Sequence, residues 1–142
     1  MLQQDNRLRK LRDFNLVMKH GQWVNGRFLD IKVLELASAR GGSANLSGKN
    51  TFTIPKKEDL ESFKKQLKLA IAAGLKVHKS AVKRNRVRRQ IREVLRLLLK
   101  DEKIKNGYYV LVVAKKDVLD KDYAEISSEL NLLLSRGKVL KS

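Results

Sequence analysis

The residues with the clearest chemical signature are the cations that gather between Lys76 and Lys100. This stretch contains one acidic residue, Glu93. So many charges of one sign repel one another unless an anion binds to them. The planar guanidinium of arginine makes paired hydrogen bonds to phosphate oxygens or to a guanine edge. The segment therefore predicts phosphate binding by Lys76, Lys79, Lys83, Arg84, Arg86, Arg88, Arg89, Arg92, Arg96 and Lys100.

The whole chain shares this bias of charge. Its 142 residues include 32 Lys and Arg against 15 Asp and Glu, which gives a formal net charge of +17. A surplus this large exceeds what solubility requires and indicates a polyanionic partner. We expect no membrane, because the first residues lack the apolar core of a signal peptide and the run Tyr108 to Ala114 is too short to span a bilayer. The expected location is the cytoplasm.

Other reactive groups are sparse or scattered. The chain has no cysteine and two histidines, which excludes disulfides, thiolate catalysis and cysteine-based zinc sites. The sequence shows no Ser-His-Asp spacing, no clustered carboxylates for two metal ions and no Gly-rich phosphate loop. We therefore expect no catalytic residues, and no metal or cofactor bound by a protein motif.

The cations are positioned by a long amphipathic helix, predicted over Ser80 to Lys100. Apolar residues recur at helical spacing along it, at Val87, Ile91, Val94, Leu95 and Leu98. Four arginines are spaced by four residues, and we expect them on the opposite face, with Asn85 and Arg89 beside them: Arg84, Arg88, Arg92 and Arg96. One face would then hold the fold while the other meets phosphate.

The remaining elements follow from periodicity and turn residues. The segment Glu58 to Ala73 fits either a helix or a strand, and we favour a short helical piece followed by a strand. An Asn106-Gly107 turn leads into a β-branched and aromatic run. The predicted elements are a helix over Asn6 to Lys19, a strand over Arg27 to Leu36, a mobile loop over Ala37 to Asn50, strands over Leu67 to Ala73 and Tyr108 to Ala114, and a last helix capped by Asp120 or Asp122.

This order of elements predicts an α+β sandwich with one sheet face covered by helices. The length is typical of one domain, so residues 1–142 are expected to form a single domain. Within it, residues 37–66 are predicted to be an insertion or flexible loop, and residues 137–142 a basic tail.

The run Arg84-Asn85-Arg86-Val87-Arg88-Arg89, followed by Ile91-Arg92-Glu93, resembles the signature of the bacterial ribonuclease P protein subunit. Weaker similarities surround it, in Arg12-Asp13-Phe14, in His20-Gly21 and in Leu69 to Lys76. Three features depart from the family pattern: the long segment Ala37 to Gln66, the alanines at 70, 72 and 73, and Leu75 in place of a common lysine.

The resemblance implies a fold and a function. The family fold is a two-layer α/β sandwich of the ribosomal-protein-S5-domain-2-like type. It has about four strands with helices and a left-handed βαβ crossover, which is the rare handedness. Its members assist a catalytic RNA that removes the 5′ leader from precursor tRNA. Hydrolysis is carried by the RNA, with Mg²⁺ held mainly by that RNA, and the protein alone is not expected to be active. The implied partners are the ribonuclease P catalytic RNA and precursor tRNA, with no protein partner predicted.

The resemblance also assigns residues to the two RNAs. Contacts to the ribozyme RNA would come from Arg84, Asn85, Arg86, Arg88, Arg89 and Arg92. Contacts to the single-stranded leader, in a cleft between the long helix and the sheet, would come from Phe14, Lys32, Ala72, Lys76 and Lys115. An aromatic ring with a few cations suits a single strand, because stacking tolerates any base and cations follow the backbone.

Other interpretations stay open for several residues and for the function. By residue type Phe14 is more typical of a core position, and Lys32 and Lys115 could be ordinary outward strand residues. We expect Trp23 to pack over the first helix, with an exposed stacking role as the alternative. The alternative function is a ribosomal protein or ribosome-assembly factor that binds rRNA. A protein-only nuclease and a DNA-binding helix fit less well, because the acids are dispersed and no helix-turn-helix pairing is visible.

Overall fold

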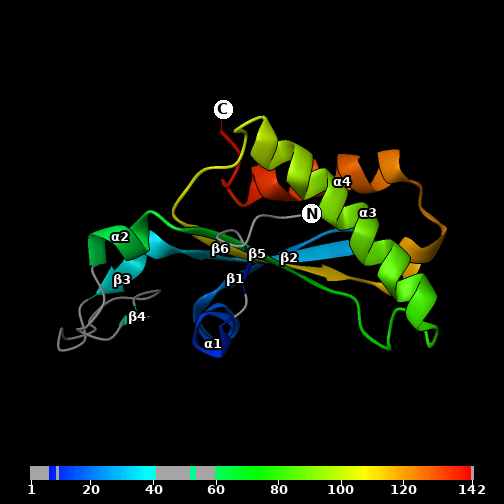
Figure 1. The fold of residues 1–142 in the computed structure, drawn as a ribbon, viewed down its shortest axis with the longest axis horizontal. Coiled ribbons are helices and arrows are strands. Elements are labelled where there is room, and N and C mark those ends of the chain that lie inside the picture. The colour runs from blue at the N-terminus through cyan, green and yellow to red at the C-terminus, as the bar shows by residue number, and fades with distance from the viewer. Residues whose placement is uncertain (1–6, 9, 41–51, 54–59, 142) are drawn as a thin grey trace.

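The framework is a mixed sheet of four strands, seen nearly edge-on in Figure 1. The computed structural model describes residues 7–8, 10–40, 52–53 and 60–141. The strands are β1 (Gln22–Asn25), β2 (Leu29–Glu35), β5 (Leu67–Ala72) and β6 (Tyr108–Ala114), in the order β1-β2-β6-β5. Strands β5 and β6 are parallel, and the other two pairings are antiparallel. A separate, short parallel pair joins β3 (Ala39–Arg40) to β4 (Phe52–Thr53).

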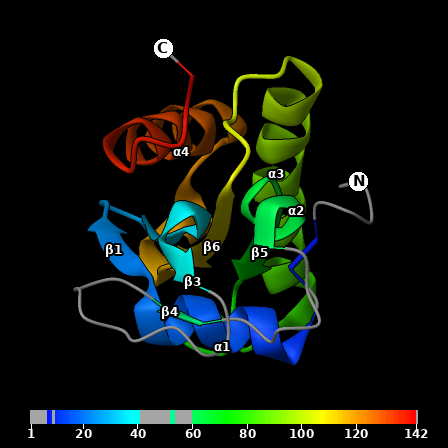
Figure 2. The same ribbon diagram turned by 90° about the vertical axis from the view of Figure 1, so that its left-hand side faces the viewer.

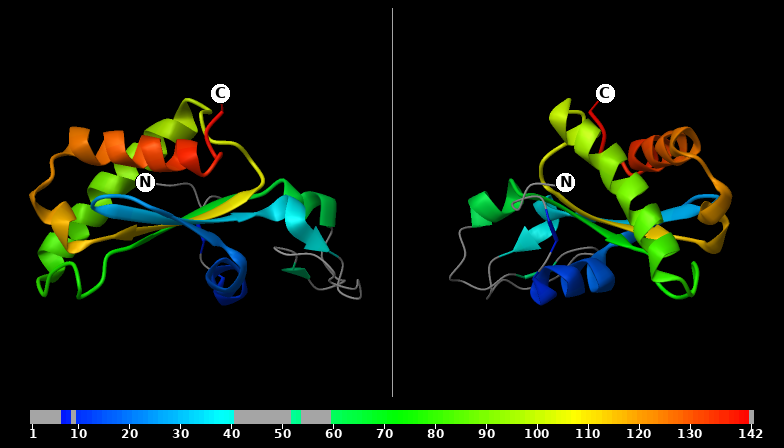
Figure 3. Two further views of the ribbon diagram at one scale, coloured as in Figure 1. Left: turned by 180° about the vertical axis from the view of Figure 1, so that it is seen from behind. Right: turned by 45° about the vertical axis from the view of Figure 1, so that its right-hand side comes forward.

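Helices lie on both faces of the sheet. Helices α3 (Ala81–Lys100) and α4 (Tyr123–Arg136) cover one face, while α1 (Leu11–His20) crosses the other, and both views in Figure 3 show the sheet between them. The α+β class and the four strands agree with the prediction. The expectation that helices cover one face was wrong, because α1 covers part of the second. The remaining helical pieces are α2 (Leu60–Lys64) and the 3₁₀ turns Leu36–Ser38 and Lys116–Asp120.

The central strand β6 explains why both faces are covered. Tyr109, Val110, Leu111 and Val112 are all at most 3% exposed. Because successive side chains of a strand point to opposite faces, Val110 and Val112 enter the core under α3 and α4, whereas Tyr109 and Leu111 enter a smaller core under α1. A strand that is apolar on both sides needs protein on both sides.

The crossover from β5 through α3 to β6 is left-handed. In Figure 2 the strand β5 starts beside the near helix α2 and runs away from the viewer, α3 lies above the sheet, and β6 lies to the left of β5. A right-handed connection would place β6 to the right. The expectation from the family resemblance is therefore confirmed.

Side-chain caps fix the starts of the two long helices. The Ser80 side chain accepts a hydrogen bond from the backbone N–H of Lys83. Asp122 accepts from the N–H of Glu125, whose own carboxylate accepts from the N–H of Asp122, which completes a capping box. Of the two predicted caps for the last helix, Asp122 is the one used.

The N-terminal part differs most from the prediction. The helix α1 begins at Leu11 instead of Asn6, because Arg7 and Leu8 run beside β5, where the Leu8 N–H donates to the Leu69 carbonyl at 2.9 Å. Strand β1 was not predicted, because its QWVN sequence is short and mostly exposed. The predicted strand over Arg27 to Leu36 is β2, which is shorter by a few residues.

Parts of the predicted insertion and of the predicted basic tail contact the core. Phe63 of α2 is 1% exposed and packs edge-to-face on Tyr109, with 5.7 Å between ring centroids. Residues 41–51 and 54–59 of the predicted insertion lie outside the described residues. In the predicted basic tail, Val139 is completely buried and Leu140 pairs with Ile104, so residues 137–141 are part of the packed structure.

A buried carboxylate ties α4 to the start of β2. Glu129, 8% exposed, accepts hydrogen bonds from the backbone N–H groups of Arg27, Phe28 and Leu29 at 2.9, 2.8 and 2.9 Å. Those groups lie where the β1–β2 connection enters the strand, and a buried amide without an acceptor is costly. One side chain thereby completes the hydrogen bonding of this turn.

We expect Glu129→Ala to lower the free energy of unfolding by about 3 kcal/mol or more, because it leaves three amides without their acceptor. Urea denaturation followed by circular dichroism measures the change. Ser128→Ala, an exposed neighbour on the same helix, is the control and should stay within about 0.5 kcal/mol of the parent. Equal stability of the Glu129 and Ser128 variants would contradict this role.

Candidate functional site

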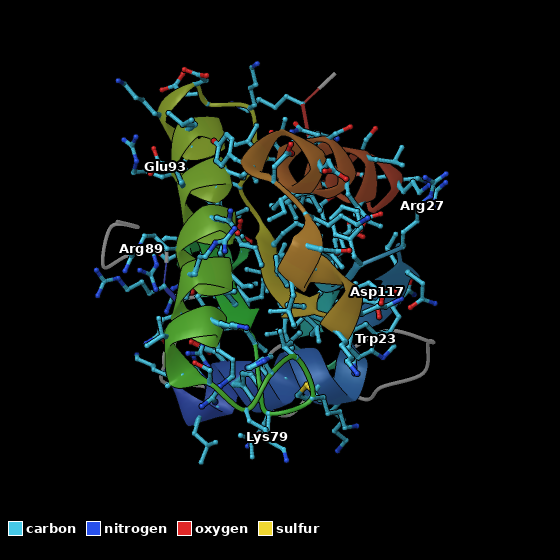
Figure 4. The ribbon with its side chains drawn as sticks, turned by 90° about the vertical axis from the view of Figure 1, so that its right-hand side faces the viewer. Trp23, Arg27, Lys79, Arg89, Glu93 and Asp117 are labelled. Carbon is cyan, nitrogen blue, oxygen red and sulfur yellow. The ribbon has the colours of Figure 1, made fainter. Side chains whose placement is uncertain are left out.

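Helix α3 presents its cations to solvent along most of its length. Its buried residues are Val87, Ile91, Val94, Leu95 and Leu98, the stripe that the sequence predicted. None of the six residues predicted to bind the ribozyme RNA is buried. Asn85, Arg86 and Arg89 are exposed, and Arg84, Arg88 and Arg92 are partly exposed. Figure 4 shows Arg89 pointing outward from α3.

The arginines spaced by four do not share one face. Four residues of an α-helix turn by slightly more than a full circle, so the row drifts around α3 from its N-terminal to its C-terminal end. Arg84 and Arg88 therefore lie beside the buried stripe instead of opposite it, and the expectation of a single opposite face was wrong for these two. The Nε of Arg84 is buried, which agrees with this position.

Arg88 joins the basic helix to the sheet. One guanidinium nitrogen donates to the backbone carbonyl of Ala73, just after β5, at 2.8 Å, and another donates to the side chain of Asn85 at 2.8 Å. Two of the predicted RNA contacts thus hold each other in place. The guanidinium keeps further N–H donors, because arginine has five.

Farther along α3 the basic surface is interrupted by one acid. Arg96 donates two hydrogen bonds to Glu93, at 3.0 and 2.6 Å. The hydrogen bond from Arg96 lowers the pKa of Glu93, so that carboxylate stays charged. Arg96 is therefore partly neutralised, and the strongest positive surface lies toward the N-terminal half of the helix.

On the other side of the sheet, α1 is held across the strands by a buried ion pair. Asp13 is completely buried, and its carboxylate contacts the Lys68 ammonium of β5 at 3.3 Å and the Arg12 guanidinium at 2.7 Å. Burial, followed by the negative charge of Asp13, raises the pKa of the nearby Tyr109 well above its usual range. The protonated Tyr109 hydroxyl donates to the Gln66 side chain. These contacts fix where α1 crosses the sheet.

On the α1 side of the sheet, one row of strand residues shares a small core with Phe14. The register aligns Asn25, Asp30, Val113 and Ala72 across all four strands. Phe14, Ala72 and Val113 pack against the same small core and keep part of their surface exposed. The four aligned residues together with Phe14 are called the α1-side row below. It spans about 14 Å, three interstrand spacings.

The predicted leader contacts are only partly brought together. Phe14 and Ala72 belong to the α1-side row, and the Lys115 ammonium sits at its edge, 3.0 Å from the Asp30 carboxylate and 2.8 Å from the Gly26 carbonyl. Lys76 is exposed in the connection between β5 and α3. Lys32 is 8% exposed, so this residue is not an outward strand position.

The burial of Lys32 has a local cause. Its ammonium donates to the carbonyl of Met18 in the last turn of α1, where the helix dipole favours a cation. It also lies 5.1 Å from the ring centroid of Trp23. Trp23 itself is 47% exposed, so about half of its surface stays open. Sequence patterns could not show these contacts, because they join segments that are distant along the chain.

Acidic side chains of the described residues do not gather into a metal site. No group of three or more His, Asp or Glu residues that could hold a metal ion occurs among them. Asp13 and Asp30 are each paired with cations, and Glu129 is occupied by backbone amides. Within the same described part of the chain, no helix is long and apolar enough to cross a membrane.

Comparison with known proteins points to one family. The sequence model of Ribonuclease P matches residues 2–138. A ribonuclease P protein component from Pseudanabaena sp. is 29% identical over 140 residues, covering 99% of this chain and 97% of that protein. The corresponding protein from Cyanothece sp. is 30% identical and covers 99% and 98%. A third, from Synechococcus sp., is 42% identical over 74 residues, which cover 52% of this chain and 54% of that protein.

Solved structures share the fold. The ribonuclease P protein of Staphylococcus aureus superposes with a TM-score of 0.63 at 20% identity, covering 96% of this chain and 98% of that one. The Thermotoga maritima protein, in complex with 1-(4-fluorophenyl)-2-thiourea, gives a TM-score of 0.61 at 21% identity and covers 92% and 98%.

The contact between Arg88 and Ala73 predicts that neighbouring arginines differ in their structural role. Arg88→Ala should lower the free energy of unfolding by about 1 kcal/mol, because a charged hydrogen bond to a backbone carbonyl is lost. Arg89→Ala, on the exposed side of the same turn, should leave it within about 0.5 kcal/mol. Thermal or urea unfolding of the two purified variants measures both changes. A larger loss of unfolding free energy for Arg89→Ala than for Arg88→Ala would contradict the structural role of Arg88.

Proposed function

Since the chain belongs to the bacterial ribonuclease P protein component family and so takes part in that ribonuclease, we propose that it binds two RNAs on different surfaces. Helix α3 binds the catalytic RNA of the complex, and the α1-side row receives the single-stranded leader of precursor tRNA. The RNA carries out hydrolysis, and the protein secures the complex and the substrate.

The observation that carries this proposal is the density of solvent-accessible cations on α3. Its buried stripe holds the helix on the sheet, while Arg86 and Arg89 are exposed and Arg84, Arg88 and Arg92 are partly exposed. The contacts that would reach the ribozyme RNA are Arg84, Asn85, Arg86, Arg88, Arg89 and Arg92. Arginine suits this role because its fork pairs with phosphate oxygens while its planar group can also stack.

The α1-side row supplies what a flexible single strand needs. Phe14 offers an aromatic surface, and the alanine side chain at 72 is small enough to let a backbone approach. Lys115 lies at the edge of the row, and Lys76 is exposed in the connection between β5 and α3. Stacking tolerates any base, and cations follow the phosphates, so such a surface binds leaders of varied sequence. In this arrangement Lys32 does not contact the RNA. Its ammonium supports the surface indirectly, because its hydrogen bond to the Met18 carbonyl fixes the end of α1.

The division of labour follows from the paired acids. Each of the buried or half-buried carboxylates Asp13, Asp30 and Glu129 already has partners within the protein. Phosphodiester hydrolysis by two metal ions needs free carboxylates that converge. In this proposal Mg²⁺ is therefore held mainly by the catalytic RNA, and the protein acts in the cytoplasm as a non-catalytic subunit. Family membership favours this role over the alternative of a ribosomal protein.

Binding of the catalytic RNA should weaken steeply with salt. Each phosphate contact contributes a slope of about 0.7 to 0.9 in a plot of log K against log salt concentration. We expect a slope of several units for the parent chain and a slope lower by about one for Arg89→Ala. Filter binding across a salt series measures both, with Ser128→Ala as the control. A flat profile for the parent would contradict binding through α3.

The leader surface predicts a preference for precursor over mature tRNA. Assembled with the catalytic RNA, the protein should bind precursor tRNA more tightly than mature tRNA. Phe14→Ala should reduce this difference in binding free energy by about 1 to 3 kcal/mol, which is the contribution of one stacked base. The catalytic RNA itself should bind Phe14→Ala normally. The measurements are equilibrium binding of both tRNAs and cleavage by RNA-free protein in Mg²⁺, and cleavage without RNA would contradict the non-catalytic role.

A further inference from the structure

Trp23 is the only tryptophan of the chain, and it is 47% exposed on the edge strand β1. An aromatic side chain of this size normally contributes most when it is buried or when it contacts a partner. Among the strands that the structure describes, β1 is the outermost of the sheet, so no further described strand pairs with its outer edge.

The ring is held in a defined place. Trp23 pairs directly with Lys32 across the antiparallel strands, so both side chains emerge on the α1 face. The Lys32 ammonium lies 5.1 Å from the ring centroid and is itself anchored on the Met18 carbonyl. A cation over an aromatic ring is attracted to it and limits its motion. The exposed part of the ring is therefore held in one orientation before any partner binds.

The ring also lies beside the α1-side row, on the same sheet face and two residues before Asn25 on β1. Met18 lies one turn after Phe14 on α1 and is 43% exposed, and the chain passes from the end of α1 directly into β1. Phe14, Met18 and Trp23 therefore follow one another from β5 toward the edge strand. Lys19 is exposed in the same last turn and can meet a phosphate.

The ring lies away from the surface proposed for the catalytic RNA. Figure 4 shows Trp23 and Arg89 on opposite sides of the molecule, with the strands between them. RNA bound along the outer side of α3 would leave Trp23 accessible to a different strand. Single-stranded RNA fits this position best, because an open aromatic surface beside cations stacks on bases of any type.

We infer that Trp23 is a second stacking platform for the single-stranded leader, on β1 beside the end of the α1-side row. This inference rests on the proposed function and extends it from Phe14 to the edge of the sheet. A leader that reaches the β1 edge gains a second stacked base, whereas mature tRNA, which has no leader, gains nothing there.

The single tryptophan provides a direct test, because fluorescence excited where tyrosine does not absorb reports on Trp23 alone. With the protein assembled on its catalytic RNA, a non-cleavable precursor tRNA should quench this fluorescence, and mature tRNA should change it little. No difference between the two tRNAs would overturn the inference.

Binding of the same precursor to three variants completes the test. Trp23→Ala should weaken precursor binding by about fivefold or more, the lower end of measured base stacking, with no effect on mature tRNA. Trp23→Phe should restore most of the loss. Tyr123→Ala, an aromatic residue 38% exposed on α4, should bind like the parent, and thermal unfolding checks that each variant is folded.

The possible failures are distinguishable. If Phe14→Ala reduces the preference for precursor tRNA but Trp23→Ala does not, the leader does not stack on Trp23, and the inference fails while the proposed function stands. If Trp23→Ala weakens both tRNAs equally, the ring does not read the leader, and the inference is overturned. If neither variant nor the parent distinguishes the two tRNAs, the leader surface itself is refuted.

Discussion

The two-sided burial of β6 determines how the rest of the molecule is arranged. Tyr109 and Leu111 point to one side, and Val110 and Val112 to the other, and all four are inside. Exposing either set would forfeit about 25 cal/mol for each Å² of apolar surface. Helices must therefore cover both faces, and the sheet becomes a partition with the arginine helix on one side and α1 on the other. Two surfaces of different chemistry result from one buried strand.

Charge is the opposing constraint. A formal net charge of +17 destabilises a compact chain through self-repulsion, and the structure offsets this with its few acids. Asp13 is buried between Lys68 and Arg12, and Asp30 faces Lys115. Each pair joins elements that build the α1-side row. The cations of α3 are largely left without such compensation, and an RNA partner supplies it.

Much of this fold could be predicted from local sequence. The stripe of α3, the apolar run of β6 and the caps at Ser80 and Asp122 depend on neighbouring residues, so their elements were predicted closely. Strand β1 was missed because an edge strand with a mostly exposed sequence carries little periodicity. The roles of Lys32 and Arg88 were missed because each donates to a backbone carbonyl, and any residue type can provide one. Phe14 and Ala72 were paired through a family resemblance, and only the folded structure shows that both pack against the same small core.

Glu129 accepts hydrogen bonds from three backbone amides that lie 100 to 102 positions earlier in the chain. Contacts of such separation form late, because the loop entropy must be overcome before they contribute. Helix α3 is different, since its hydrogen bonds join residues four apart and helices form within about a microsecond. Its arginines can therefore meet phosphate before α4 has closed over β2. If RNA binds α3 as proposed, it also stabilises chains in which this helix is already formed, so the partner would bias the order of folding as well as bind the finished protein.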